Sequence, residues 1–232
     1  MAIPTAHGLA RQLHRLLPFD HLLPGEHRGT ADPGPTAEER ILDAALARFA
    51  EYGVGVTTMS AIARDTGISR EWLYRHFRNR DAVVIAVTTR EVSRLIDGLA
   101  EQAELADDLE SIITEAFSYA VEFLGEHALL QQVLRNEPDI LSSVLLDQGG
   151  SVLTTAVDVS VVYLTAIAPF ETEQAVTLAE TLVRLVVAIT LAPQGRLDLR
   201  DPAELRRFGR SVVSALLPAA VTAASAERLS AG

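Results

Sequence analysis

The spacing of three small or apolar residues is the feature that most restricts the fold of this chain. In the stretch TTMSAIARDTGISREWLYRHF, which begins at Thr57, Ala63 is followed four residues later by Gly67 and ten residues later by Leu73. A small residue lets two helices cross closely, a glycine in the turn takes a positive φ, and a leucine clamps the second helix to the first. The spacing predicts a helix-turn-helix, whose second helix enters the major groove of DNA.

A further helix is predicted directly before this motif. Residues 36–53 read TAEERILDAALARFAEYG, in which Thr36 and Glu39 have the spacing of a capping box and Gly53 suits the position after a helix. Apolar residues recur between these ends at helical intervals, so one face of the helix is expected to be buried. The residues of that face are Ile41, Ala44, Ala45, Phe49 and Tyr52.

Nearly all of the remaining chain has helical periodicity. Asn79 is suited to cap the next helix, and glycine or proline residues separate several of those that follow. The predicted helices cover residues 82–104, 109–124, 127–138, 139–147, 150–168, 171–192 and 202–224. The segment SVVYLTAI (160–167) is rich in β-branched residues, so a buried strand is an alternative there. With no strand–helix alternation and no internal repeat, the predicted fold class is all-α.

Positive charge is concentrated on the predicted helix-turn-helix. The whole chain has a formal net charge of −11, which taken alone argues against nucleic-acid binding. From Arg64 to Arg80, however, five arginines stand against two acidic residues. A basic segment within an acidic chain is compatible with a localised DNA contact.

The sequence lacks the residues that several kinds of chemistry require. The chain has no cysteine, which excludes disulfides and thiolate metal sites. It contains no HExxH helix, GxSxG elbow or phosphate-binding loop, so we expect no enzymatic activity. Four histidines lie in residues 1–35, but prolines and glycines between them prevent a fixed ligand geometry, and we expect no metal or cofactor.

The sequence carries no recognisable export or membrane signal. Charged and polar residues, among them Arg11, His14 and Asp20, interrupt the leucines near the N-terminus. The longest uncharged apolar run near the middle, residues 159–170, is shorter than the about 20 residues that a bilayer-spanning helix needs. We therefore expect a cytoplasmic protein without a membrane segment.

The motif and its flanks resemble the DNA-binding region of the tetracycline-repressor (TetR) family of one-component transcriptional regulators. Members typically show a Thr-capped helix, then IA, Gly, Ile or Val, Ser, and LYxHF before a basic residue. Residues 57–83, TTMSAIARDTGISREWLYRHFRNRDAV, follow that order, and the resemblance extends over about residues 36–85. It implies an N-terminal three-helix DNA-binding domain followed by a C-terminal helical bundle that binds a ligand and dimerises.

By this resemblance the chain divides into three parts. Residues 1–35 form a flexible N-terminal extension, residues 36–81 the helix-turn-helix DNA-binding domain, and residues 82–232 the effector-binding and dimerisation domain. Within the extension, residues 8–17 can form at most a short amphipathic helix. Its apolar side consists of Leu9, Leu13, Leu16 and Leu17.

The resemblance also assigns eight residues to DNA contacts. Those expected to hold phosphates are Thr58, Tyr74, His76 and Arg80. Those expected to approach base edges, at the N-terminal end of the recognition helix, are Ser69, Arg70, Glu71 and Trp72. The chemistry fits, because Tyr and His donate to phosphate oxygens, Arg adds a charge-assisted contact, and helix N-termini favour anions.

The chain departs from the family at Glu71 and Trp72, where members commonly have a small residue and Thr. Glu71 faces a negative field on DNA, so it either accepts from a cytosine amino group or turns aside to pair with Arg70 or Arg75. Trp72 either lies against a thymine methyl group or packs beside the preceding helix. The sequence leaves both alternatives open.

The second half of the chain is expected to sense a ligand and to form the dimer. Aromatic or polar residues that interrupt aliphatic faces are the candidate ligand contacts: Phe117, Phe123, Gln131, Tyr163 and Arg184. The resemblance implies a homodimer through the two C-terminal helices. Its candidate contacts are Leu178, Leu182, Leu185, Val186, Ile189, Leu205, Phe208, Val212, Val213, Leu216 and Leu217. Plain core packing is the alternative for both sets.

The sequence therefore predicts a ligand-responsive transcriptional regulator, a repressor, that binds a palindromic double-stranded DNA operator as a homodimer. A small, mostly apolar effector is expected to release it by moving residues 82–104. The alternative is a helical ligand-binding or interaction protein whose N-terminal module has lost specific DNA binding.

Overall fold

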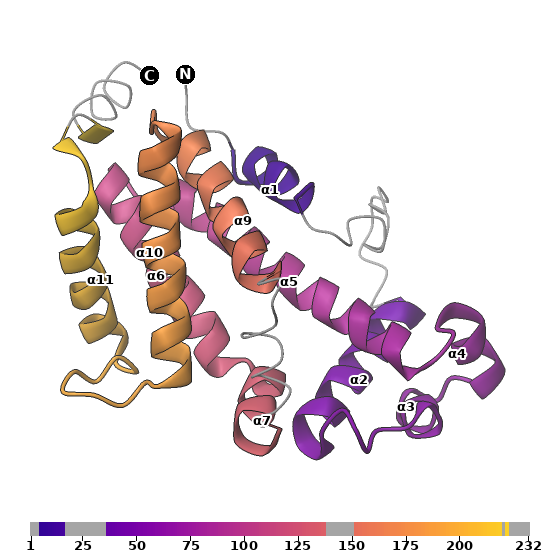
Figure 1. Ribbon diagram of the computed structural model, residues 1–232. Helices are drawn as coiled ribbons and strands as arrows, with labels where there is room; N and C mark the ends of the chain where they lie inside the picture. Colours follow the sequence, from indigo (N-terminus) through magenta and orange to yellow (C-terminus); the bar gives the residue numbers. More distant parts are fainter. Residues whose placement is uncertain (1–4, 17–35, 138–150, 220, 223–232) are drawn as a thin grey trace. The chain divides into compact units, whose positions relative to one another are not determined.

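The computed structural model describes residues 5–16, 36–137, 151–219 and 221–222 (Figure 1). These ranges contain helices and no strand, which confirms the all-α prediction. The helices are α1 (Ala6–His14), α2 (Ala37–Tyr52), α3 (Met59–Thr66), α4 (Arg70–His76), α5 (Arg80–Leu105), α6 (Leu109–Glu126), α7 (Ala128–Asn136), α9 (Ser151–Ile167), α10 (Thr172–Leu191) and α11 (Pro202–Leu216). The helix predicted at residues 139–147 lies outside the described residues.

Local sequence signals determine where the first helices begin and end. The capping box of α2 is present: the amide of Glu39 donates to Thr36 Oγ1 at 3.1 Å, and the amide of Thr36 donates to the Glu39 carboxylate at 2.6 Å. Gly53, directly after α2, has a φ of 90°, and Gly67, between α3 and α4, has a φ of 68°. Both values lie in the region that favours glycine, so both turn predictions are confirmed.

The helices fall into two compact groups of contacts. The N-terminal unit comprises α2, α3, α4, the part of α5 up to Ser93, and α7; the C-terminal unit comprises α1, α5 from Arg94, α6, α9, α10 and α11. The units therefore divide between Ser93 and Arg94, in the middle of α5, and not at residue 82 near the start of that helix. The predicted functional boundary between residues 81 and 82 stays a prediction.

The N-terminal unit is built around one apolar cluster. Phe49 of α2, Ile62 of α3 and Leu73 of α4 are fully buried in it, together with Val83 and Val87 of α5. α7, which comes later in the sequence than α5, also packs on α2. α3 and α4 share this core with α5, which is more than twice as long as either. The close-packed core gives the helix-turn-helix a rigid support.

The C-terminal unit is a helical bundle in which α6 contacts both α10 and α11, while α9 contacts α10 (Figure 1). Gly209 of α11 permits a close approach to α6. A Cβ atom at that position would lie 3.0 Å from the ring of Phe117, which is itself buried. Phe117 is thus a core residue at the α6–α11 contact.

The N-terminal extension contains a packed helix, α1. Leu9 and Leu13 are fully buried against the C-terminal unit, where α1 contacts α9, and His14 bonds to Asp97 of α5 at 2.9 Å. The helix predicted in residues 8–17 is confirmed with different ends. Leu16 is exposed, because the helix ends at His14.

The apolar helices α9 and α10 test two expectations from the sequence, a possible strand at residues 160–167 and the lack of a membrane segment. α9 contains residues 160–167, so the strand alternative is wrong; helical packing against α10 and α1 overrides the weak strand preference of its valines. α10 is long and apolar enough to cross a bilayer by length and composition, which the sequence analysis did not note. A core helix of a soluble protein has the same composition, so this is weak evidence for a membrane segment.

Candidate nucleic-acid interface

Hydroxyl side chains cap the N-terminal ends of both α3 and α4. Thr58 Oγ1 accepts from the amide of Ala61 at 3.2 Å, and Ser69 Oγ accepts from the amide of Trp72 at 3.1 Å. Both Thr58 and Ser69 are exposed, so their hydroxyl hydrogens remain free to donate outward. Thr58 is the cap of α3, whereas the neighbouring Thr57 is buried and its hydroxyl donates to the carbonyl oxygen of Gly53.

The outer face of α4 presents a small set of polar side chains. Arg70 and Tyr74 are exposed, and no hydrogen bond or ion pair of Arg70 occurs among the described residues. Glu71 is also exposed and lies 3.4 Å from Arg75, one turn further along the helix. Of the two alternatives for Glu71, the structure shows the one in which it pairs with Arg75.

Trp72 lies on the inner side of α4. Its side chain is half-buried and packs on the apolar cluster of the N-terminal unit. It also stacks on His76, with 3.6 Å between the ring centroids and 15° between the planes. Trp72 therefore packs in this structure, as the second alternative from the sequence has it.

Arg80, expected at a phosphate, is engaged within the unit. Its Nη1 donates to the carbonyl oxygen of Gly55 at 2.8 Å, and its Nε lies 3.7 Å from Asp81. The side chain remains 39% exposed, so part of the guanidinium is still open to solvent. The structure thus gives Arg80 a contact to the loop before α3; its predicted phosphate contact stays a prediction.

A largely buried ionic network lies in the same unit and was not predicted from the sequence. His127 Nε2 lies 3.3 Å from Glu91, which lies 3.0 Å from Arg90, which in turn pairs with Asp43 at 2.7 Å. The network joins α2, α5 and the start of α7. A signal was present: Glu91 continues the buried series of Val83 and Val87 at intervals of four, where a carboxylate is unexpected.

The geometry of α2 to α5 matches a known family. Residues 41–87, which include both helices of the turn and the Gly67 position, match the family model described as "Bacterial regulatory proteins, tetR family". This segment of the chain is similar to the DNA-binding region of the TetR family. This confirms the resemblance seen in the sequence, and the matched segment ends within α5.

Individual transcriptional regulators are similar to part of the chain. The HTH-type transcriptional regulator AcrR of Shigella flexneri is 28% identical over 130 residues, which is 47% of this chain and 60% of AcrR. The HTH-type transcriptional repressor Rv1474c of Mycobacterium tuberculosis is 28% identical over 43% of this chain and 52% of that protein. The chain thus spans little more than half the length of these curated relatives.

The whole fold is similar to a solved TetR-family structure. The TetR family repressor AlkX from a Dietzia strain, implicated in biodegradation of n-alkanes, aligns with a TM-score of 0.54 at 18% identity. The alignment covers 76% of this chain and 93% of AlkX. At this identity the likeness establishes the fold, which includes the helical C-terminal part.

The five candidate ligand residues lie in different surroundings. Phe117 is buried against Gly209, and Phe123 is half-buried with its ring centroid 5.9 Å from that of Tyr119. Arg184 is exposed and paired with Glu180 on its own helix. Gln131 is half-buried on α7, in the N-terminal unit, whereas the other four belong to the C-terminal unit.

Tyr163 is the candidate with the strongest polar signal. It is 6% exposed on α9, and its hydroxyl has no hydrogen-bond partner among the described residues. Burial raises the pKa of the Tyr163 hydroxyl well above its usual value, so it is a neutral donor. A role in ligand binding stays a prediction for all five residues.

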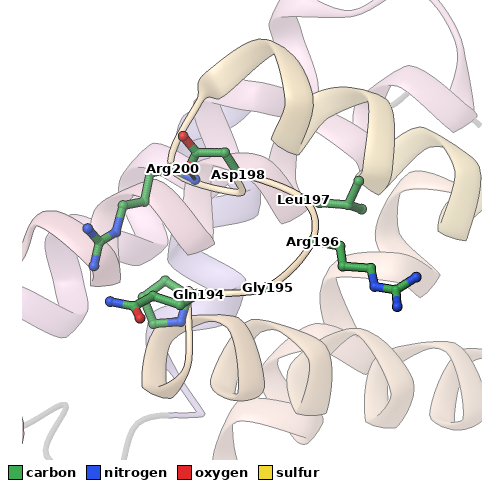
Figure 2. A pocket seen from close by; sticks show the side chains of 7 residues that line it. Gln194, Gly195, Arg196, Leu197, Asp198 and Arg200 are labelled. Atoms are coloured by element: carbon green, nitrogen blue, oxygen red, sulfur yellow. Dashed lines mark hydrogen bonds between the residues drawn. The ribbon is translucent and has the colours of Figure 1, made fainter.

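A hollow on the C-terminal unit lies away from these candidates. Figure 2 shows it at the loop between α10 and α11, with a volume of about 250 Å³ and a lining of Pro193, Gln194, Gly195, Arg196, Leu197, Asp198 and Arg200. The side chains of Arg196 and Arg200 point away from each other (Figure 2). The two guanidinium groups therefore do not converge on one point of the hollow.

The residues predicted at the dimer contact divide into two groups. Leu178, Ile189, Leu205 and Val213 are buried within the chain, so core packing accounts for them. Leu216 is exposed, and the rest of the predicted set is half-buried. α10 and α11 each have an apolar face that packs against α6 or α9. The predicted dimer contacts include residues of that inner face, which is why some of them are buried within the chain.

Proposed function

We propose that this chain is a TetR-family DNA-binding transcriptional regulator, a repressor, that binds a palindromic operator through α3 and α4. The observation that carries the proposal is the outer face of α4, where Arg70 and Tyr74 are exposed next to a glycine turn on a buried core. An unpaired guanidinium at the start of a recognition helix suits a bidentate contact to guanine. The family match and the similarity to named regulators support the same function.

The proposed regulator is a homodimer through the outer faces of α10 and α11. A second apolar stripe runs along α10 at residues 176, 183, 187 and 191, beside the Glu180–Arg184 ion pair, and Val176 and Leu191 are both at least 40% exposed. Of the most apolar stretch of α10, 28% is buried within the chain. Burying this stripe against a second copy removes apolar surface from water and supplies the two half-site readers that a palindrome requires.

The proposed effector is small and mostly apolar, and it binds in the C-terminal unit. The buried and unpartnered hydroxyl of Tyr163 supports a ligand with one hydrogen-bonding group. SmeT, a solved structure with a TM-score of 0.51 at 21% identity, was determined as a complex with triclosan and covers 77% of this chain and 90% of its own. Since α5 contributes residues to both units, we propose that it transmits the effector's influence to the DNA-binding surface.

A second candidate is a ligand-binding protein without specific DNA binding, located like the first in the cytoplasm. Glu71 favours it, because an exposed carboxylate on α4 meets the negative field of DNA. In the DNA-binding regulator that we propose first, the pairing of Glu71 with Arg75 offsets that repulsion. Neither proposal involves enzymatic catalysis.

A selection of genomic DNA fragments bound by the full chain at moderate salt separates the two candidates. A regulator recovers a common palindromic sequence. A protein that has lost specific binding recovers fragments without a shared motif, held weakly and lost as salt is raised.

A further inference from the structure

The recognition helix carries a stacked aromatic pair, Trp72 and His76, one turn apart. Their ring centroids are 3.6 Å apart and the planes differ by 15°. Trp72 also packs on the apolar cluster of the N-terminal unit. One face of the His76 imidazole is therefore fixed by a side chain that is itself fixed by the core.

A hydrogen bond sets the rotation of the same imidazole. His76 Nδ1 lies 2.9 Å from the backbone carbonyl oxygen of Trp72. A carbonyl oxygen only accepts, so Nδ1 carries a hydrogen and donates it. Nε2 is then the one ring nitrogen of His76 that remains available to DNA, and the side chain is exposed.

We propose that Trp72 is a positioning residue for His76, and that His76 contacts a DNA phosphate through Nε2 in its protonated form. This rests on the proposed function. In the neutral imidazole with hydrogen on Nδ1, Nε2 is an acceptor, and a phosphate oxygen also only accepts. Contact therefore requires the imidazolium, in which both nitrogens donate, so DNA binding takes up a proton at His76.

Further charged groups lie on α4 itself and on α3, which packs on α4. On α4, Glu71 and Arg75 pair with each other at 3.4 Å, and Arg70 lies at the start of the helix. α3, which packs on α4, carries Arg64 and Asp65, and Asp65 pairs with Arg48 at 2.5 Å. Within the described residues none of these groups contacts His76, so the proton uptake is assigned to the imidazole itself.

The stacking also accounts for the departure from the family at position 72. A side chain that read a base would need a free aromatic face or edge in the groove, whereas the indole is covered by His76 and by the core. Trp72 thus acts on affinity through His76 and leaves sequence preference to the exposed residues of α4. The prediction that Trp72 approaches a base edge is replaced here by an indirect role.

A double-mutant cycle on the full chain tests this inference. The probe is a mixed-sequence DNA duplex at low salt, on which phosphate contacts govern affinity, and the variants are Trp72→Leu, Trp72→Phe, His76→Ala and the combination of Trp72→Leu with His76→Ala. We expect His76→Ala and Trp72→Leu each to weaken binding about tenfold, the size of a lost charge-assisted hydrogen bond. Trp72→Phe, which keeps a stacking ring, is expected to retain most of the affinity.

The combined variant decides between positioning and simple loss of structure. If Trp72 acts through His76, the double variant binds no more weakly than His76→Ala alone. The inference is overturned if the losses of affinity from the two substitutions multiply in the double variant. It is also overturned if the Trp72→Leu variant binds DNA as tightly as the wild type does. Wild-type chain that fails to bind the duplex at all contradicts the proposed function instead.

The pH dependence of binding is a further readout, and the tautomer of His76 is one that needs no variant. Wild-type affinity is expected to rise as pH falls through the range in which imidazoles titrate, about pH 8 to 5, and to change little over that range in His76→Ala. Nitrogen NMR of the wild-type chain is expected to show the Nδ1–H tautomer for neutral His76. The Nε2–H tautomer, or equal pH dependence in both proteins, would rule the proposal out.

Discussion

The guanidinium of Arg80 donates to the carbonyl oxygen of Gly55 at 2.8 Å, which links the first residue of α5 to the loop between α2 and α3. That loop leads into Thr58, the cap of α3. Arg80 thereby holds the N-terminal end of α3 in place relative to α5. A residue that the family resemblance assigns to phosphate binding has a structural contact of its own.

Replacing Arg80 by Ala is expected to affect both stability and DNA binding. Loss of a hydrogen bond from a partly exposed charged group costs about 1 kcal/mol in the free energy of unfolding. Affinity for a DNA duplex falls as well, because the α3 cap loses its support. Chemical denaturation and fluorescence anisotropy measure the two effects.

Arg78→Ala is the matched control, since Arg78 is exposed and has no hydrogen bond or ion pair among the described residues. It removes the same charge without changing the free energy of unfolding. Equal stability of the Arg80→Ala variant and the wild type would show that the Gly55 contact contributes nothing.

Gly67→Ala is expected to destabilise the chain by about 1 kcal/mol, because Gly67 has a φ of 68° and a Cβ there is strained even though nothing crowds it. Gly67→Asn is expected to cost less, since Asn tolerates the left-handed region. Thermal unfolding of the variants gives the comparison.

Gly125→Ala controls for the loss of glycine itself. No atom lies within 4 Å of an added Cβ at Gly125, and this residue lies in α6 without a positive φ. The same substitution should therefore leave stability unchanged or raise it by up to about 1 kcal/mol. A Gly67→Ala variant as stable as Gly125→Ala would mean that the turn does not require a left-handed residue.

Asp108→Ala is expected to lower stability in a pH-dependent way. The backbone amide of Ser111 donates to Asp108 Oδ1 at 2.9 Å, and this bond holds the pKa of the Asp108 carboxyl below its usual value. A lowered pKa in the folded state means that the carboxylate stabilises the fold above its unfolded pKa, and that this contribution is lost as pH falls through the folded pKa. The variant should cost about 1 kcal/mol at neutral pH and little in acid.

Asp108→Asn separates the effect of the hydrogen bond from Ser111 from the effect of the negative charge. The amide oxygen still accepts from Ser111 but does not titrate, so the free-energy difference from Asp108→Ala should not vanish in acid. Denaturation curves at several pH values measure this. A constant cost of Asp108→Ala from neutral to acid pH contradicts the assignment.

Val187→Arg is expected to break the proposed dimer. Val187 is half-buried in the outer apolar stripe of α10, where a second copy would desolvate an unpaired guanidinium. Sedimentation should show a single chain, with DNA affinity reduced. Leu105→Arg is the control, because Leu105 is 75% exposed at the end of α5 and lies outside that stripe; its mass should equal that of the wild type.

Positions governed by backbone geometry or by strong periodicity could be predicted from the sequence. Gly67 needs a positive φ, Thr36 and Glu39 need each other's amides, and each requirement appears as a residue type at a fixed spacing. The helical period of residues 171–192 likewise predicts α10 to within one residue at each end.

Side-chain partners across the fold could not be predicted in the same way. The bond from Arg80 to Gly55 and the network of Glu91 with His127 join residues that are far apart in sequence. Trp72 shows the same limit: whether an indole packs or projects depends on the core beside it, which the sequence of α4 alone does not determine. The inner and outer stripes of α10 are both apolar, so periodicity did not tell core from surface.

The most direct test of sequence-specific recognition through α4 is to repeat the selection of bound genomic fragments with Arg70→Ala beside the wild type. The account predicts one palindromic motif for the wild type and, for the variant, relaxed preference at the same base position in both half-sites. An identical motif from both proteins, or none from the wild type, would contradict it.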